Sequence, residues 1–277
     1  QEDSTMSPQI IMAIVMFIYL AFMVIIGIFY SKAGSSSTKD FYLGGRKLGP
    51  LVTAMSAEAS DMSSYLLMGL PGLAYFSGVA DVGWTIVGLA AGTYLNWLLV
   101  TKRLRIYSEE IDAFTVPGFF SKRFGDDKNI LSLIAALIII IFFIPYTASG
   151  FAAVGKLFNS LFGFDYTISM LVGAAVIIVY TILGGFLAVS TTDLIQSIVM
   201  TISLLVILGF GISLCGGTGE IIDVANTVPG YLNMFSNANV VTHETSTYGF
   251  ISVISTLAWG LGYFGMPHIL LRFMGAR

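Results

Sequence analysis

The 25 residues LSLIAALIIIIFFIPYTASGFAAVG, from Leu131 to Gly155, decide the fold class because they contain no charged side chain. An α-helix needs roughly 20 apolar residues to cross a hydrocarbon core of about 30 Å, so this stretch is long enough to span a membrane. Five further long apolar runs occupy Ile10–Tyr30, Gly83–Val100, Tyr166–Val189, Leu194–Leu214 and Tyr248–Leu271. The sequence therefore predicts an all-α integral membrane protein.

Composition agrees with this fold class. Of 277 residues, 56% are hydrophobic and 10% are charged, whereas a soluble domain carries about 25% charged residues. Backbone groups find no water inside lipid, so a chain can cross only as helices or as a closed barrel. The ten-residue alternation of a transmembrane barrel is absent. A soluble all-α protein with a buried core is the weaker alternative.

A seventh segment, Leu51–Phe76, has the length of a span but contains Glu58, Asp61 and the pair Pro71–Gly72. The distribution of basic residues decides whether it crosses. With the N-terminus outside and seven spans, the outside segments hold one basic residue, Lys156. The inside segments then hold the other twelve: Lys32, Lys39, Arg46, Lys47, Lys102, Arg103, Arg105, Lys122, Arg123, Lys128, Arg272 and Arg277. This positive-inside bias favours a single transmembrane domain over 1–277, with the C-terminus inside.

The segments outside the spans carry little chemistry. The outside loop 216–246 is acidic and predicts a short helix near Glu220–Thr227. The single cysteine, Cys215, excludes a disulfide within the chain. No phosphate-binding loop, zinc motif or nucleophile elbow is present, and no basic face suits a nucleic acid. We therefore expect no enzymatic activity and no catalytic residue.

The segment Ala57-Glu-Ala-Ser-Asp-Met-Ser-Ser64 places two carboxylates and three hydroxyls in the middle of a span. An ionised side chain there costs about 2.5–3.5 kcal/mol on insertion scales, so Asp61 is a candidate functional residue. Small polar residues compete for backbone hydrogen bonds and can unwind a helix that lines a cavity. The unwound carbonyls would suit a hard cation such as sodium. The alternatives are a structural cap for Asp61 and, for Glu58, a side chain that reaches the interface.

The last span holds Trp259, Tyr263 and Pro267 at intervals of four, which predicts one helical face. Aromatic rings beside glycines form a plausible slot for a small ring or amino acid. Pro267 lacks an N–H and should free a carbonyl near Tyr263. The alternatives are helix packing or an interfacial aromatic belt, and we expect His268 to be an interfacial anchor.

Two weaker candidates lie in the middle of the chain. Tyr146 follows Pro145 and so lies at a predicted helix kink. The triplet Thr191-Thr192-Asp193 predicts an N-cap for the sixth apolar run, with Asp193 as the capping residue. On local sequence alone, this capping role is favoured over a functional one.

Four segments together resemble the sodium/solute symporter family. They are YLGGRKLGP at 42–50, SAEASDMS at 56–63 with LMGLPG at 67–72, GGFLAVS at 184–190 with Asp193, and WGLGYFG at 259–265 before Pro267 and His268. They occur in the family's order and cover nearly the whole chain. The resemblance implies a LeuT-type inverted-repeat transporter fold in truncated form. It would consist of a leader helix, the first five-helix repeat and the first helix of the second repeat.

The resemblance also implies an activity: sodium-coupled symport of proline or a similar small amino acid by alternating access, in a bacterial cytoplasmic membrane. Sodium would be the co-transported ion. The family's functional positions then fall on named residues of this chain. Sodium would meet Ala59, Met62, Asp61 and Asp193; the substrate would meet Ser63, Ser64, Tyr146, Trp259, Tyr263 and Pro267; coupling would involve Arg46 and Glu58.

The chain departs from the family in two respects. Close relatives often have glycine where this chain has Glu58, so we expect its cation affinity or pH dependence to differ from theirs. The family is also about twice as long, and helices of its second repeat complete the sodium site. The alternatives are therefore a symporter for another organic or amino acid, and a non-transporting fragment or half-transporter that needs a partner. A channel, a receptor or a structural membrane subunit is a further possibility.

Overall fold

The computed structural model describes residues 7–34, 37–63 and 65–277, so the predicted substrate residue Ser64 lies outside the described residues. The chain forms two compact units, each made of separate stretches of sequence. The first unit comprises Gln1–Ala59, Tyr107–Ile195 and Met274–Arg277. The second comprises Ser60–Ile106 and Gln196–Phe273.

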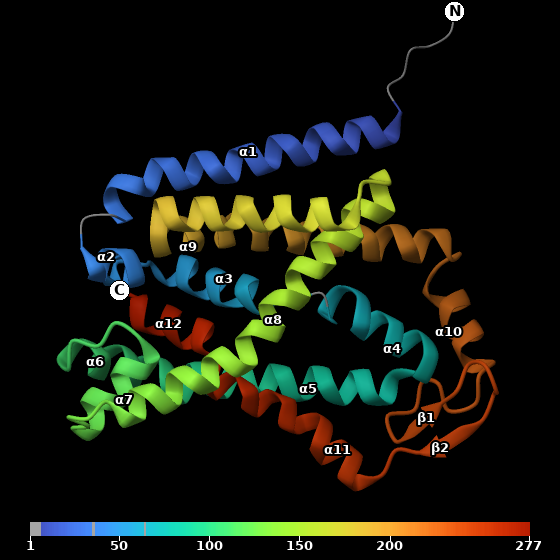
Figure 1. Ribbon diagram of the computed structural model, residues 1–277. Coiled ribbons are helices and arrows are strands. Elements are labelled where there is room, and N and C mark those ends of the chain that lie inside the picture. The colour runs from blue at the N-terminus through green and yellow to red at the C-terminus, as the bar shows by residue number, and fades with distance from the viewer. Residues whose placement is uncertain (1–6, 35–36, 64) are drawn as a thin grey trace, which may run out of the picture. The chain divides into compact units, whose positions relative to one another are not determined.

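The first unit combines long helices with shorter ones (Figure 1). This unit contains α1 (Pro8–Gly34), α2 (Thr38–Leu43), most of α3 (Pro50–Asp61), α7 (Val116–Phe124), α8 (Ile130–Phe162) and the first part of α9 (Tyr166–Leu214). The second unit contains α4 (Leu70–Ser77), α5 (Val79–Asn96), α10 (Thr218–Asn226), β1 (Ser236–Ala238), β2 (Thr245–Thr247), α11 (Phe250–Leu257) and most of α12 (Pro267–Gly275). The helix α6 (Lys102–Glu110) contains the boundary between the two units.

In the first unit, α1 runs beside the first part of α9 (Figure 1). Met23, Ile26 and Ala188 form a buried cluster between these helices. A glycine makes the close approach possible, because a Cβ atom on Gly27 would lie 2.9 Å from the Cα atom of Tyr180. Small residues allow helix backbones to approach in this way in membrane proteins.

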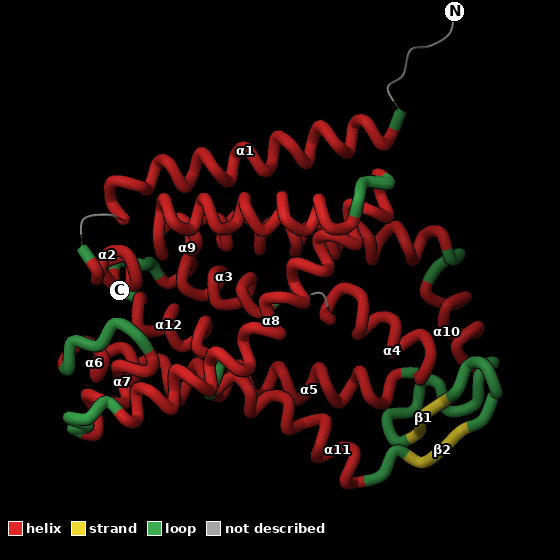
Figure 2. Tube along the Cα trace, in the orientation of Figure 1, coloured by secondary structure: helices red, strands yellow, loops and turns green. Residues whose placement is uncertain are grey.

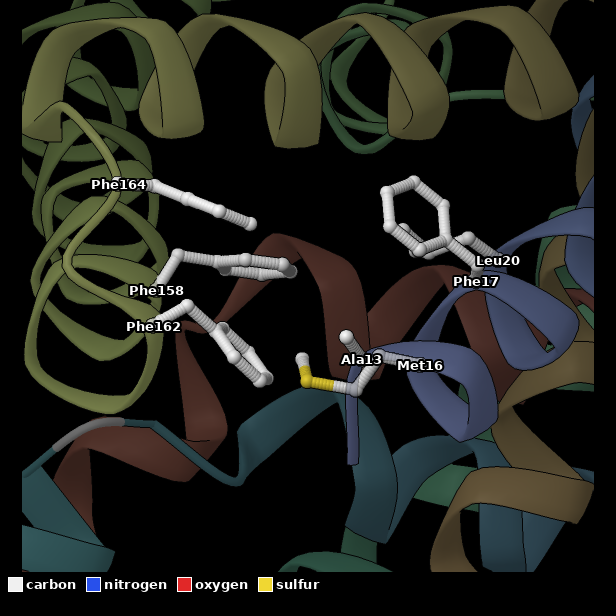
Figure 3. Close-up of a pocket in the computed structure, with 7 residues that line it drawn as sticks. All are labelled: Ala13, Met16, Phe17, Leu20, Phe158, Phe162 and Phe164. Carbon is white, nitrogen blue, oxygen red and sulfur yellow. The ribbon is translucent and has the colours of Figure 1, made fainter. Parts of the chain in front are cut away.

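The end of α8 faces α1 across an aromatic cluster (Figure 3). The gap between them has a volume of about 10 Å³, which is at the lower limit for one water molecule. Its lining is entirely apolar: Ala13, Met16, Phe17 and Leu20 from α1, with Phe158, Phe162 and Phe164 opposite. We therefore treat it as a packing gap rather than a binding site.

The helix α9 is interrupted at Gly185, whose φ and ψ are 58° and −153°. Residues with a side chain rarely adopt this conformation, so glycine suits the break. The interruption falls before Thr191-Thr192-Asp193, which therefore lies inside a helix. The hydroxyl of Thr191 donates to the carbonyl of Leu187 at 2.8 Å, as hydroxyls inside helices do. The prediction that Asp193 caps the next helix is therefore wrong.

The second unit combines helices with a short hairpin (Figure 2). The strands β1 and β2 are antiparallel, with Ser236 opposite Thr247. The short helix predicted near Glu220–Thr227 is confirmed as α10. The helix α5 continues into a π-helical turn, Trp97–Thr101, and packs against α11 and the 3₁₀ helix Ala258–Phe264 that follows it.

Helices occupy each of the seven predicted ranges. In the part of the chain that the structure describes, α1, α5 with its continuation, α8 and α9 are long and apolar enough to cross a membrane. A fifth candidate is the pair Phe250–Phe264 and Pro267–Gly275, which is bent by 43°. The segment 51–76 is divided between α3 and α4. Length and composition of these helices identify a multi-pass membrane protein.

Candidate functional site

The candidate site begins at a helix break in the segment 51–76. The helix α3 ends at Asp61, and Met62 and Ser63 have no regular secondary structure. A π-helical turn, Tyr65–Gly69, then leads into α4. The predicted unwinding after the small polar residues is therefore confirmed. The last four carbonyls of a helix have no partner within it, and in α3 they include the carbonyl of Ala59.

Asp61 faces residues of the last predicted span, within the second unit. The hydroxyl of Tyr263 donates to Oδ2 of Asp61 at 2.5 Å. The Oδ1 atom lies 4.0 Å from Nε2 of His268. The side chains of His268 and Asp61 are 16% and 23% exposed. The carboxylate thus keeps part of its surface open, and His268 faces it instead of serving as the predicted interfacial anchor.

The predicted stripe of Trp259, Tyr263 and Pro267 on one helical face is wrong. The segment Ala258–Phe264 is a 3₁₀ helix, in which three residues complete a turn. Residues four apart therefore point about 120° apart instead of lying above one another. Trp259 is 51% exposed and Tyr263 is 9% exposed. These two aromatic side chains serve different contacts.

Trp259 pairs with a residue of the π-helical turn. Its ring centroid lies 5.2 Å from that of Tyr65, with 39° between the ring planes. This separation is within the range for aromatic pairs. Because both rings are more than one-third exposed, they offer an apolar surface beside the break.

Pro267 begins α12 and, as predicted, has no N–H to donate to the carbonyl of Tyr263 four residues earlier. The side-chain amide of Asn96 donates to that carbonyl at 2.9 Å. Sequence reasoning missed Asn96, which is 1% exposed. The available signal was its spacing. Asn96 lies four positions after Gly92, and Gly92 four after Gly88, which places all three residues on one side of a helix.

Asp193 lies in the first unit and has a partner there. The hydroxyl of Ser56 donates to Oδ2 of Asp193 at 2.6 Å. Ser56 is fully buried and Asp193 is 8% exposed. The pair therefore joins α3 to the stretch of α9 that follows the break at Gly185, through a buried charge-assisted hydrogen bond.

Arg46 forms a second polar centre in the first unit. Gly44, Gly45 and Arg46 all have positive φ values, of 57°, 63° and 58°, and this turn carries a guanidinium that is 4% exposed. It donates to Oγ and the carbonyl of Ser108 at 2.8 and 2.9 Å, and to the carbonyls of Ala113 and Met274 at 2.8 and 2.7 Å. We call these four residues the Arg46 cluster.

The remaining predicted residues lie in less enclosed surroundings. Tyr146 is in α8, in the first unit, and is 37% exposed with its ring 5.3 Å from that of Phe143. Glu58 is exposed on α3. Ser63 is partly buried at the break, where its carbonyl accepts from the backbone N–H of Leu66 at 3.1 Å.

Sodium/proline symporters from Staphylococcus aureus strains USA300 / TCH1516 and JH9 are each 42% identical over 278 residues. The matches cover 100% of this chain and 51% of each relative. The chain therefore spans about half the length of the curated relatives it matches.

The fold is similar to that of a solved transporter structure. It is described as the substrate-bound outward-open state of a Na⁺-coupled sialic acid symporter. The TM-score is 0.66 at 19% identity, over 95% of this chain and 59% of the other. This likeness confirms the expected LeuT-type fold. The profile of the sodium:solute symporter family matches residues 41–277, and the chain belongs to that family.

Proposed function

We propose that this chain supplies the first half of a sodium-coupled symporter for proline or a similar small amino acid. The observation that carries the proposal is the position of Asp61. A carboxylate lies at a break in a segment long enough to span a membrane, where it accepts a hydrogen bond from Tyr263 and faces His268 at 4.0 Å. Family membership and the name of the S. aureus relatives support the ion and the substrate.

Sodium binds at the end of α3. A hard cation prefers oxygen ligands, and broken helices in transporters supply them from unwound carbonyls. The carbonyls of Ala59 and Met62 are the proposed ligands, with the charge of Asp61 nearby. Asp193 contributes through its contact with Ser56, which lies on the same helix, α3.

The amino-acid substrate binds on the other side of the break. Its carboxylate is attracted to the N-terminal end of the helical segment that begins at Tyr65, which carries a partial positive charge. Its apolar part packs against the exposed faces of Tyr65 and Trp259. Arg46 acts indirectly in this proposal, by fixing the turn that leads into α3.

Transport follows from differential affinity. Binding of sodium and substrate together shifts the population towards the inward-open state, by the difference in their affinity for the two states. Exposed Glu58 and Tyr146 belong to regions that change surroundings in this transition. Alternating access around a fixed midplane site is the common mechanism of inverted-repeat transporters.

The proposed setting is a bacterial cytoplasmic membrane, crossed seven times with the N-terminus outside. The basic residues support this orientation. The exposed thiol of Cys215 lies just after α9 and is the probe for it. In intact cells, a membrane-impermeant maleimide should label the wild type and not Cys215→Ala. Equal labelling of both proteins in intact cells, with a difference only after lysis, would reverse the orientation.

The proposal is tested with the full-length gene product in proteoliposomes. Uptake of radiolabelled proline should depend on an inward sodium gradient. Asp61→Ala should reduce the sodium-stimulated rate at least about a hundredfold, because the charge at the cation site is lost. The matched control is Asp223→Ala, which removes an exposed carboxylate from α10.

Two results would contradict the proposal. Proline uptake by the wild type that is independent of sodium would remove the coupling. Sodium stimulation that is unchanged in Asp61→Ala would remove the assigned site. Competition by other amino and organic acids against labelled proline then identifies which substrate class binds most tightly.

A further inference from the structure

One side of α5 is buried although it is not apolar. Thr85, Gly88, Gly92 and Asn96 are all buried, and their spacing of three or four residues keeps them on one side of the helix. In the second unit this side packs against α11 and the 3₁₀ helix Ala258–Phe264 (Figure 1). A polar surface in this position needs an explanation, because buried polar groups are costly unless they form hydrogen bonds.

The two glycines bring the backbones into contact. A Cβ atom on Gly92 would lie 2.2 Å from the carbonyl oxygen of Gly260, and one on Gly88 would lie 2.7 Å from that of Leu257. A Cβ atom on Gly260 would in turn lie 2.0 Å from the carbonyl oxygen of Gly88. No side chain fits between these segments. Their separation is therefore fixed, and Asn96, one turn after Gly92, is held against the end of the 3₁₀ helix.

At this point a buried side-chain amide donates to a backbone carbonyl. Pro267 cannot donate to the carbonyl of Tyr263, and the amide nitrogen of Asn96 donates to it instead, at 2.9 Å. The orientation of the amide follows from chemistry, because a carbonyl only accepts and the nitrogen must face it. Among the described residues, the amide oxygen of Asn96 has no hydrogen-bond partner. The hydrogen bond that Asn96 forms in this buried position is therefore the one donated by its amide nitrogen.

Tyr263 is held at both ends. Its carbonyl accepts from Asn96, and its hydroxyl donates to Asp61. Asn96 and Asp61 come from different segments of the second unit, so Tyr263 connects α5 to the helix break. A change at Asn96 releases the backbone of Tyr263 and moves the hydroxyl relative to the carboxylate.

We infer that Asn96 is a positioning residue for the cation site: its amide fixes the backbone of Tyr263 at the break before Pro267 and so aims the tyrosine hydroxyl at Asp61. The inference rests on the proposed function. Asn96 touches neither ion nor substrate, and it acts through Tyr263 alone. Its substitution should therefore change the sodium concentration for half-maximal uptake more than the maximal rate.

The test measures proline uptake by the full-length protein over a range of sodium concentrations. Asn96→Ala should raise the half-maximal sodium concentration roughly tenfold and leave the maximal rate within about twofold of the wild type. Thr85→Val is the matched control, because it removes a polar group from the same buried side without touching Tyr263. Asn96→Leu, which keeps the volume and has no donor, should behave like Asn96→Ala and replaces it if the smaller side chain prevents folding.

A double substitution separates positioning from general damage. If Asn96 acts through the hydroxyl of Tyr263, Asn96→Ala combined with Tyr263→Phe should have the half-maximal sodium concentration of Tyr263→Phe alone. Additive effects would overturn the inference, as would a wild-type sodium dependence in both Asn96 variants. In either case the proposed function stands, provided that the wild type is stimulated by sodium. Absence of that stimulation in the wild type overturns the proposed function, and the inference with it.

Discussion

Arg46 and Asp61 are both partly or fully removed from solvent and both lie at a helix end, yet their surroundings differ. Arg46 is 4% exposed and donates four hydrogen bonds to oxygen atoms of the first unit. Among the described residues, Asp61 accepts one hydrogen bond, from Tyr263, and its side chain is 23% exposed. The guanidinium of Arg46 is enclosed by protein, whereas the carboxylate of Asp61 has one hydrogen-bond donor among the described residues and keeps part of its surface exposed.

The difference indicates which charge is structural. A buried charge with many hydrogen bonds loses stability when it is removed, because its partners are left unsatisfied. A carboxylate with few partners is costly to keep and suits a site whose remaining ligand is a cation. Substitutions should therefore separate the two residues by their effects on stability and on sodium dependence.

The largest effect is expected from Arg46→Ala. Loss of the guanidinium leaves the carbonyls of Ala113 and Met274 and both oxygens of Ser108 without this donor, at a cost of about 3 kcal/mol or more. Thermal unfolding of the purified full-length protein in detergent, with bound ligands held constant, measures it. The unfolding temperature of Arg46→Lys should lie between those of the wild type and Arg46→Ala, since an ammonium group cannot reproduce the planar set of donors.

The control for Arg46 is Arg103→Ala, which removes an exposed guanidinium from α6. An Arg46→Ala protein that unfolds at the wild-type temperature but has lost sodium stimulation would contradict the comparison. It would move Arg46 from a structural to a direct coupling role.

A smaller effect is expected from Tyr263→Phe, which removes the hydrogen bond to Asp61. The carboxylate loses its one described hydrogen-bond partner, and we expect about a tenfold rise in the half-maximal sodium concentration. Thermal stability should change little in comparison with Arg46→Ala. Sodium-dependent proline uptake measures the first quantity and an unfolding curve the second.

Tyr248→Phe is the matched control for Tyr263. The hydroxyl of Tyr248 also lies in a close hydrogen bond, at 2.5 Å from Oγ1 of Thr256, but in a contact away from Asp61. Equal shifts in sodium dependence for the two variants would show that any lost tyrosine hydroxyl in this region has the same consequence.

The smallest effect is expected from Glu58→Gln. Glu58 is exposed on α3, one turn before the break, and the charge of an exposed side chain is well screened. The half-maximal sodium concentration should stay within about twofold of the wild type. A larger rise in uptake assays would sharpen the comparison by adding a second carboxylate to the cation site.

Local chemistry made part of this site predictable. The run of small polar residues before Ser64 predicted the break after Asp61, because these residues stabilise non-helical backbone. The missing N–H of Pro267 predicted that the carbonyl of Tyr263 would need another donor. Both features depend on residues that are neighbours in sequence.

The rest depended on packing. Trp259 and Tyr263 point in different directions because their segment is a 3₁₀ helix, which four-residue spacing does not reveal. Asp193 is not a cap because the helix breaks earlier, at Gly185. The spacing of Asn96 from Gly88 and Gly92 places it on a buried side of α5 but does not identify its partner, which is 167 residues away.

The Arg46 cluster also restricts the order in which the protein can form. The hydrogen bond from Arg46 to Met274 joins residues 228 positions apart, and Leu48 pairs with Ala276 in the same region. At about 5–20 residues per second of synthesis, the ribosome needs on the order of 10–45 s to proceed from Arg46 to Met274. During that interval the guanidinium must be satisfied by water or lipid headgroups, so this turn is completed late in biogenesis, after the apolar helices between its two halves have been made.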